Sequence, residues 1–355
     1  MIVSHSRRAL CKAARLLCVL SAPAAHAVKA EGGGSAGGSA GTRYGAWLPA
    51  SQQAGSGLGS SGVFGDLASA YDAARPAYPA QLFSDAKQLA PPGTRSADVG
   101  CGTGRGALAM ARLGYDVVAV DCDRGMLQQV AASAAAAGVG DAVRCVEAAG
   151  EDTGLEAGSV QLATILQAFH WMDAPRTLRE ARRYLAPRGV LVLAWNDRCL
   201  ETGWVCELEA LIEKYNPHYD RHLKQYDPDA WTPVLTQPLG GGDLPGFELV
   251  AHRRYANDCS FDGADGLIAV LRTYSYVAKA LSDEQAAALE ADVRALVARV
   301  HGEGVPFVLP TVCKAYVLRA PAWWNRIPGL LPREVATFGR DWPSEGAAAR
   351  PRSAG

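Results

Sequence analysis

The stretch Asp98-Val99-Gly100-Cys101-Gly102-Thr103-Gly104-Arg105-Gly106 decides the fold of this chain of 355 residues. It starts with an acidic residue at the end of a predicted strand and carries glycine at every second position. The pattern predicts a tight turn, a helix over 107–113, and a second strand over 116–120 that closes on Asp121. Such a unit holds an adenosine-containing cofactor at the carboxyl edge of a parallel sheet, because glycine lets a ligand approach the backbone closely.

The turn fits two different cofactors. Residues 102–107 match G-x-G-x-x-A, and Asp121 follows at the spacing of roughly 20 residues that a nicotinamide dinucleotide site requires. Asp98, however, directly precedes the turn, where a carboxylate repels a pyrophosphate. The same carboxylate suits the ammonium group of S-adenosylmethionine. The residues therefore favour S-adenosylmethionine over NAD and over a purely structural turn.

Further segments, taken in order with this turn, share one resemblance. They read Y-D-A-A-R-P-A-Y-P at 71–79, V-A-V-D-C-D-R-G-M-L at 118–127, G-E-D-T-G-L at 150–155, Q-A-F-H-W at 167–171 and L-R-T-Y-S-Y-V at 271–277. Together with D-V-G-C-G-T-G at 98–104, they resemble the motifs of class I S-adenosylmethionine-dependent methyltransferases. The similarity is to the type-11 branch, which includes trans-aconitate methyltransferase-like proteins, and spans about residues 64–320.

The resemblance implies an α/β fold with a Rossmann-like, seven-stranded, mostly parallel sheet, helices on both faces, and a cap or lid in the C-terminal half. The hydrophobic pattern agrees, because strands and helices alternate up to about residue 198. Strands are predicted to end at Val99 and to span 116–120, 143–146, 160–166, 190–195, 247–255 and 311–319. Besides 107–113, helical segments are predicted at 64–90, 131–137, 176–184 and 264–300, with an inserted lid at 199–245.

Composition divides the chain into three parts. Residues 1–62 have the character of a targeting leader and a Gly/Ser/Ala-rich linker, and residues 321–355 that of a Pro/Arg-rich tail. The methyltransferase domain is predicted at 63–320, with its core at about 92–198 and cap elements at about 199–300. The leader is basic and ends on a small-x-small site, which favours import into a plastid or mitochondrion. A secretory signal and a cytoplasmic location stay open.

The net charge and the cysteine content limit the classes of binding partner that we expect for this chain. A net charge of −1 gives no electrostatic footprint for nucleic acid. The apolar run of the leader is too short to span a bilayer, so no stable membrane anchor is expected. Nine cysteines without a C-x-x-C pair indicate reduced thiols. We therefore expect a small-molecule substrate, and the sequence leaves the oligomeric state open.

The resemblance assigns most cofactor contacts. Asp98 would hold the methionine ammonium, Asp121 the ribose, and Met126 the adenine face, unless Met126 is a helix core residue. The family often has an acid against adenine where Ala149 stands here, which leaves Glu151 as the expected contact. Gln161 is a second departure, because this strand usually carries aspartate. The complete cofactor-binding set is Asp98, Gly100, Gly102, Gly104, Asp121, Met126, Glu151, Gln167, Tyr71 and Arg75.

Methyl transfer from a sulfonium needs alignment and exclusion of water, and no metal is expected. His170 is predicted to be either a general base near neutral pH or a donor that orients the acceptor. Trp171 would offer its face to the sulfonium. Simple packing of the loop is the alternative for both residues. Candidate substrate contacts on the cap are Tyr274, Arg272 and Tyr276.

These features predict methyl transfer to an oxygen, nitrogen or carbon nucleophile of a small molecule, with a carboxylic acid among the candidates. A carboxylate needs no base, and His170 would then only orient it. Two other functions remain open on the sequence. One is an inactive module that binds S-adenosylmethionine, and the other is an NAD-dependent oxidoreductase.

Overall fold

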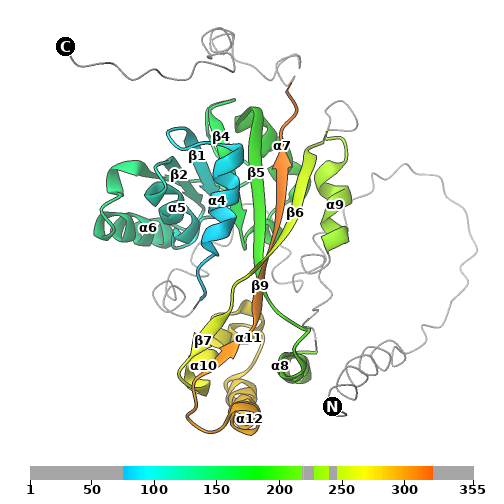
Figure 1. The fold of residues 1–355 in the computed structure, drawn as a ribbon. Helices are drawn as coiled ribbons and strands as arrows, with labels where there is room; N and C mark the ends of the chain where they lie inside the picture. Colours follow the sequence, from blue (N-terminus) through cyan, green and yellow to red (C-terminus); the bar gives the residue numbers. More distant parts are fainter. Residues whose placement is uncertain (1–74, 218, 220–227, 240–245, 323–355) are drawn as a thin grey trace, which may run out of the picture. The chain divides into compact units, whose positions relative to one another are not determined.

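A computed structural model describes residues 75–217, 219, 228–239 and 246–322 of the chain (Figure 1). The predicted leader and linker, almost all of the predicted tail, and Tyr71 lie outside the described residues. Within them, no helix is both long and apolar enough to cross a membrane.

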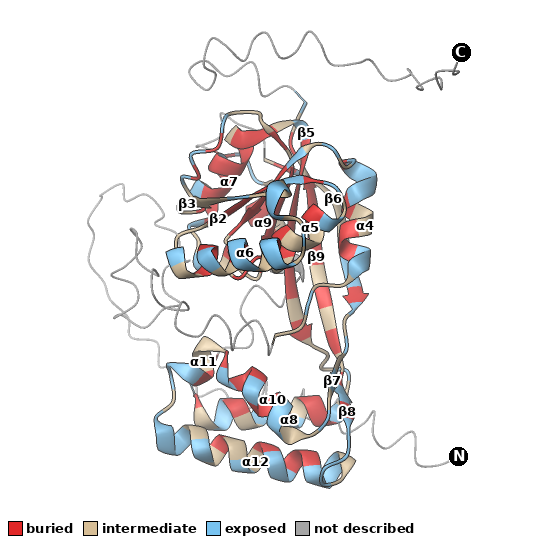
Figure 2. Ribbon diagram, turned by 90° about the vertical axis from the view of Figure 1, so that its left-hand side faces the viewer, coloured by how far each residue is buried: buried red, intermediate tan, exposed pale blue. Residues whose placement is uncertain are grey.

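A seven-stranded sheet in the order β3-β2-β1-β4-β5-β9-β6 organises the fold (Figure 1). The pairs β3/β2, β2/β1, β1/β4 and β4/β5 are parallel, and β9/β6 is antiparallel. This confirms the predicted Rossmann-like, mostly parallel sheet. The central strands are buried along most of their length (Figure 2), as expected for strands covered on both faces. The strands are β1 (Arg95–Val99), β2 (Asp116–Asp121), β3 (Val143–Glu147), β4 (Val160–Leu166), β5 (Leu185–Arg198), β6 (Glu248–Ala256) and β9 (Thr311–Arg319).

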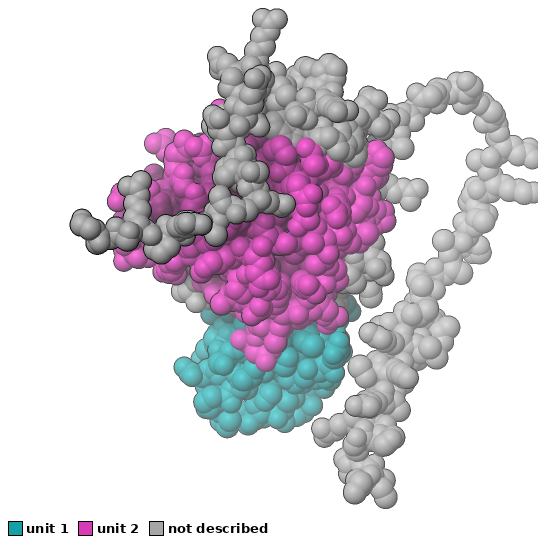
Figure 3. Space-filling view, turned by 45° about the horizontal axis from the view of Figure 1, so that its top comes forward, with its two compact units in different colours: residues 1–56, 198–219, 259–310 teal, residues 57–197, 220–258, 311–355 magenta. Residues whose placement is uncertain are grey.

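The chain divides into two compact units, which Figure 3 colours. We call the first the sheet unit, whose described residues lie within 57–197, 220–258 and 311–355. The second is the helical unit, whose described residues lie within 198–219 and 259–310. The predicted domain bounds, with the core at 92–198 and the cap at 199–300, stay predictions beside this division.

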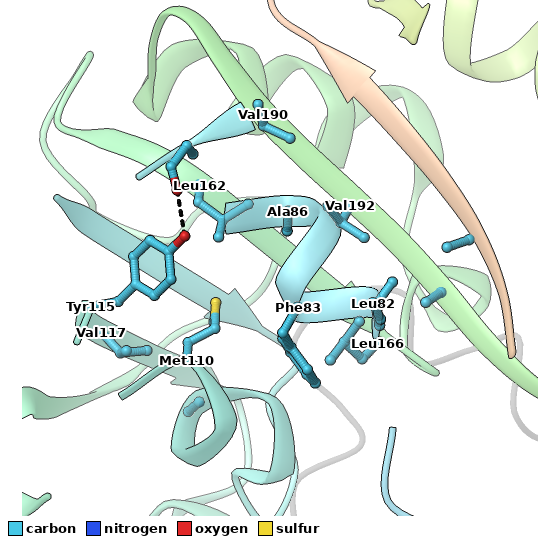
Figure 4. Close-up of a cluster of buried hydrophobic side chains, with 14 of the residues drawn as sticks. Leu82, Phe83, Ala86, Met110, Tyr115, Val117, Leu162, Leu166, Val190 and Val192 are labelled. Carbon is cyan, nitrogen blue, oxygen red and sulfur yellow. Dashed lines mark hydrogen bonds between the residues drawn. The ribbon is translucent and has the colours of Figure 1, made fainter. Parts of the chain in front are cut away.

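Helices cover both faces of the sheet. On one face, Leu82, Phe83 and Ala86 of α4 (Ala80–Leu89) pack into one core cluster with Val190 and Val192 of β5 (Figure 4). On the other face, α9 (Pro228–Thr236) brings the Trp231 ring onto Trp195. Side chains of a strand alternate between faces, so consecutive residues of β5 serve both layers. The remaining helices of the sheet unit are α5 (Arg105–Arg112), α6 (Arg124–Ala136) and α7 (Ala174–Tyr184).

Two predicted elements differ from the structure. Within the described part of the predicted helical stretch 64–90, residues 76–79 form no regular structure and α4 begins at Ala80, while residues 64–74 lie outside the described residues. Pro76 and Pro79 explain this, because a proline disfavours helical geometry in the residue before it. Strand β5 runs five residues further back and three further forward than the predicted 190–195. By contrast, β4 and β9 have the predicted bounds.

The helical unit has its own core. The predicted helical stretch 264–300 consists of three helices, α10 (Ala264–Arg272), α11 (Ser275–Ala278) and α12 (Asp283–His301). They pack with α8 (Gly203–Tyr215) around Trp204, Leu208, Leu271 and Val293. A two-stranded antiparallel sheet, β7 (Cys259–Phe261) with β8 (Phe307–Leu309), was not predicted. Helix α8 was predicted only as part of the inserted lid at 199–245.

Candidate active site

The loop between β1 and α5 lies where the strand order reverses, at the carboxyl edge of the parallel strands. Gly100, Gly102 and Gly104 all have positive φ, at 67°, 53° and 87°. A Cβ on Gly100 would lie 2.6 Å from the Cβ of Ala168, and one on Gly104 would lie 2.9 Å from Val130. A Cβ on Gly102 would meet nothing within 4 Å. Packing thus explains two of the glycines, whereas Gly102 borders open space.

Asp98 ties this loop to the sheet. Its Oδ2 accepts the backbone N–H of Ala107 at 2.8 Å, and its Oδ1 accepts the hydroxyl of Thr164 at 2.6 Å. The side chain is 1% exposed, and burial raises its pKa to about 6. Gly106 is required for this fit, because a Cβ there would lie 2.6 Å from Oδ2 of Asp98. The sequence did not reveal the contributions of Thr164 and Gly106.

Asp121 ends β2 beside the same loop. Its Oδ2 accepts the N–H of Gly102 at 2.8 Å, and its Oδ1 accepts the N–H of Asp123 at 2.9 Å. Burial raises its pKa, although the side chain stays partly accessible. Asp123 caps α6 by accepting the N–H groups of Gly125 and Met126. Met126 itself is 4% exposed, and its packing against adenine stays a prediction.

Glu151 has a structural partner. Its Oε1 accepts the N–H of Asp173 at 2.7 Å, and Asp173 in turn caps α7 by accepting the N–H of Arg176. The carboxylate therefore fixes the start of α7, and its contact with adenine stays a prediction. A Cβ on neighbouring Gly150 would lie 2.8 Å from Sδ of Met172, so this loop is closely packed.

Gln167 follows β4 in a left-handed conformation with φ of 56°, which is rare for a residue with a side chain. Two hydrogen bonds hold it there. Its N–H donates to the carbonyl of Ala194 at 2.8 Å, and its Nε2 donates to the carbonyl of Asn196 at 3.0 Å. Strain of this kind concentrates at functional sites, where the surroundings enforce it.

His170 lies in a short 3-10 helix, η3 (Phe169–Trp171), that follows β4. Its Nδ1 lies 3.1 Å from Nε1 of Trp195, and an indole nitrogen only donates hydrogen bonds. Nδ1 must therefore be the acceptor, and the neutral ring carries its proton on Nε2. Burial, together with the positive charge of Arg75, lowers the pKa of His170 to about 3. In this arrangement the ring offers a donor at Nε2, and which of the two predicted roles His170 has in catalysis stays a prediction.

Aromatic rings of β5 and α9 pack around η3. The Trp195 ring stacks on Trp231 at 5.8 Å between centroids, and Phe169 meets Trp231 edge-on at 5.1 Å. Trp171 is different, because it is 46% exposed, with its ring 5.3 Å from that of His170. An exposed indole at this place is available to a ligand. Trp195 and Trp231 were not predicted as site residues.

Arg75 belongs to the segment 75–79, which precedes α4 and contains no helix or strand. The carbonyl of Ala77 accepts hydrogen bonds from Nδ2 of Asn257 at 2.8 Å and from Nδ2 of Asn196 at 3.4 Å. Nδ2 of Asn257 also donates to Oδ1 of Asn196 at 3.1 Å. This cluster could not be predicted, because side chains that bind a backbone carbonyl leave no sequence pattern at the accepting residue.

Comparison with known proteins now decides the family. Residues 97–193 match the methyltransferase domain family. An uncharacterized methyltransferase of Mycobacterium tuberculosis is 36% identical over 202 residues, which cover 54% of this chain and 76% of that protein. The chain belongs to the class I S-adenosylmethionine-dependent methyltransferases.

Two further similarities accompany this one. An uncharacterized methyltransferase of Schizosaccharomyces pombe is 31% identical over 147 residues, which cover 41% of this chain and 56% of that protein. A solved structure from Anaeromyxobacter dehalogenans, described as a "Putative Type II Methyltransferase", is 23% identical with a TM-score of 0.49. It covers 70% of this chain and 98% of that chain.

S-adenosylmethionine is the cofactor of this family, and the described residues of this methyltransferase fit it. Gly102 borders open space at the switch point of the sheet, and the partly accessible carboxylate of Asp121 stands beside it. Exposed Trp171 and donor His170 follow β4, the neighbouring strand. Among the described residues, no cluster of three or more His, Cys, Asp or Glu side chains is arranged to hold a metal ion.

The predicted substrate contacts all lie in the helical unit and have partners there. Arg272 is paired with Glu290 through two hydrogen bonds of 2.5 and 2.7 Å. The rings of Tyr274 and Tyr276 flank the buried guanidinium of Arg198 at 5.3 and 5.9 Å. Nη1 of Arg198 also donates to the hydroxyl of Tyr276 at 3.0 Å. All three residues thus interact with other side chains of the helical unit, and their contact with substrate stays a prediction.

Proposed function

We propose that this methyltransferase transfers the methyl group of S-adenosylmethionine to a carboxylate oxygen of a small organic acid. The observation that carries the proposal is the hydrogen bond from Trp195 to Nδ1 of His170. It leaves His170 with a donor, Nε2–H, and no lone pair for a proton. Such a ring orients an acceptor that is already an anion, and it does not activate one that must first lose a proton.

The charge beside His170 supports the same acceptor class. Arg75 acts on the His170 ring strongly enough to contribute to its lowered pKa. The buried Asp98 and the partly accessible Asp121 stand instead at the ends of β1 and β2, on the cofactor side of the site. A cation and a neutral donor on the acceptor side attract a carboxylate and repel an ammonium group.

Methyl transfer to a carboxylate requires no general base. When bound, S-adenosylmethionine supplies a methyl group activated by the sulfonium charge. A carboxylate lone pair forms the new oxygen–carbon bond as the carbon–sulfur bond breaks, and no proton is released. The protein has to align the two partners and exclude water. We assign the ribose to Asp121, the amino-acid part to the Gly102 cradle with Asp98 behind it, and the sulfonium to the face of Trp171.

The test is a substrate screen with methyl-labelled S-adenosylmethionine. Small mono-, di- and tricarboxylic acids are compared with phenols, amines and thiols of similar size. We expect labelled product only from the acids, and we expect mild alkali to release it as methanol, because methyl esters hydrolyse while methyl ethers and methylamines do not. An alkali-stable product would contradict the proposed acceptor class and leave the family unchanged. Labelling of a protein or nucleic acid instead would contradict a small-molecule substrate.

A further inference from the structure

The segment 75–79, which carries Arg75, is contacted by two asparagine side chains at one backbone atom between its two prolines. That atom is the carbonyl oxygen of Ala77, on which Asn257 and Asn196 converge. A carbonyl has two lone pairs, and the two asparagines fill both. The bond between Asn257 Nδ2 and Asn196 Oδ1 closes the triangle, so each asparagine also fixes the other. We call these two side chains the asparagine clamp.

We propose that Asn257 and Asn196 are positioning residues that hold Arg75 beside His170. They touch neither cofactor nor acceptor and act through the backbone of Ala77. That Arg75 serves an acidic acceptor rests on the function proposed above. The holding of the segment does not, and it can be measured without any substrate.

The two asparagines of the clamp are fixed by strands of the sheet unit. Asn196 belongs to β5, and its carbonyl also accepts the Nε2 of Gln167, which connects the clamp to the end of β4. Asn257 follows β6 directly, and its N–H donates to the carbonyl of Thr311 at 3.0 Å. The hydroxyl of Thr311 donates back to the carbonyl of Asn257. Three neighbouring strands therefore fix where the Ala77 carbonyl must lie.

The other end of the segment is fixed separately. Three residues after Ala77, α4 begins, and its residues Leu82 and Phe83 are buried against the sheet. The hydroxyl of Tyr255 in β6 donates to Asp85 of α4 at 2.9 Å. Without the clamp, we expect α4 and the Tyr78 side chain, which packs against the same core cluster, to stay docked, and the backbone around Ala77 to become more mobile. The clamp is therefore redundant for the fold of the helix, and its use lies in where it places Arg75.

Two consecutive residues of β5 make the contacts to His170 and to Ala77. Trp195 points to one face of the sheet, where it donates to His170, and Asn196 points to the opposite face, where it holds Ala77. One strand thus orients the neutral donor through Trp195 and positions the cation through Asn196. Asn257 completes the second task from the neighbouring antiparallel pair β6/β9.

The first experiment measures the segment in the full chain without ligand. Hydrogen exchange is followed by mass spectrometry in wild type, Asn257→Ala, Asn257→Asp and Tyr255→Phe. We expect faster exchange at 75–79 in both Asn257 variants, and more so in Asn257→Asp, because a carboxylate is repelled by the Ala77 carbonyl. Tyr255→Phe is the matched control, since it removes a bond from β6 to α4 and none to Ala77. Unchanged exchange in the Asn257 variants would overturn the clamp.

The second experiment separates positioning from mere stabilisation. The titration of the His170 ring is followed by nitrogen-15 NMR in Arg75→Gln, Asn257→Ala and the double variant. We expect the pKa of His170 to rise in both single variants, because each removes the positive charge from its side. In the double variant, the pKa of His170 should rise no further than it does in Arg75→Gln. Additive shifts, or none in Asn257→Ala, would show that Asn257 does not act through Arg75.

A third readout depends on the acceptor. With a small acid that is methylated, Arg75→Gln and Asn257→Ala should each raise KM roughly tenfold, the expected loss of a hydrogen bond to a charged group, and the double variant no more than that. If the acids are not substrates while exchange and NMR respond as expected, the proposed function fails and the clamp stands. The reverse pattern overturns the clamp alone.

Discussion

At the scale of single residues, the buried carboxyl of Asp98 lowers the stability of the free protein at neutral pH, although we expect it to support cofactor binding. Its buried carboxyl has a pKa near 6 instead of 3.8, because desolvation outweighs the hydrogen bonds from Thr164 and Ala107. For an acid whose folded pKa is raised, the stabilising contribution is present below the unfolded value and is lost as pH rises through the folded value. The free protein should therefore lose on the order of 3 kcal/mol at this residue between about pH 4 and pH 6.

Asp98→Asn tests this argument. An amide stays neutral, and the hydroxyl of Thr164 can turn to accept from it, since the carbonyl of Ala97 lies 3.4 Å away as another acceptor. We expect the variant to unfold with about 1–2 kcal/mol more free energy than wild type at pH 8 and with no gain at pH 4, as measured by urea titration. Calorimetry should show weaker binding of S-adenosylmethionine. An equal stability difference at both pH values would contradict the assigned pKa.

His170 gives a second prediction at this scale. Wild type should show no inflection in its rate profile from this residue between about pH 5 and 8, because the ring stays neutral there. Trp195→Phe removes the donor to Nδ1, so the pKa should rise and both ring nitrogens should share the proton, which nitrogen-15 shifts distinguish. Trp231→Phe is the control, because it removes an indole of the same stack whose Nε1 has no hydrogen-bond partner within the described structure. Equal behaviour of the two variants would contradict the tautomer assignment.

Residue-level prediction worked where the role depends on the local sequence. Asp98 and Asp121 follow strand ends directly, and their places beside the glycine loop could be predicted from spacing alone. Trp195 and Asn257 could not, because their partners are 25 and 180 residues away in the chain. Glu151 has a suitable residue type, but the structure shows it bound to Asp173, a contact that depends on how η3 leads into α7.

At the scale of elements, the glycine loop makes two different demands on its glycines. Gly102→Ala places a Cβ in open space, so only the left-handed backbone is penalised, by about 1 kcal/mol. Gly104→Ala adds a contact of 2.9 Å with both methyl groups of Val130 in α6. We expect Gly102→Ala to fold with a small loss of Tm and to bind S-adenosylhomocysteine much more weakly, whereas Gly104→Ala should lose more Tm. Normal affinity in Gly102→Ala would remove this loop from the cofactor site.

Element prediction succeeded where burial alone decides the structure. The apolar run that became β4 had the right bounds, because a strand covered on both faces needs apolar residues throughout. The alternating stretch that became β9 also had the right bounds. The segment before α4 failed for the opposite reason. Residues 75–79 carry two prolines and are bound at Ala77 by the asparagine clamp, so helical periodicity was the wrong signal for this described part of the segment.

At the scale of the whole molecule, two cores imply two unfolding events that need not coincide. Only the sheet unit contains Asp98, Gly102 and Asp121, so only its transition should respond to the cofactor. S-adenosylhomocysteine at 100 times its Kd adds about 2.7 kcal/mol to the stability of the unit that binds it. For a unit of this size, that corresponds to a rise in Tm of roughly 5–10 °C.

Differential scanning calorimetry of the full chain can check this expectation. We expect S-adenosylhomocysteine to move one transition and NAD to move none, because the carboxylate of Asp98 lies behind the turn where a pyrophosphate would have to bind. Asp121→Asn should reduce the cofactor-dependent shift, since an amide offers the ribose hydroxyls one acceptor oxygen in place of two. A shift with NAD would mean that the glycine loop accepts a dinucleotide despite Asp98. A cofactor shift confined to a transition that Asp121→Asn leaves unaltered would place the cofactor elsewhere in the molecule.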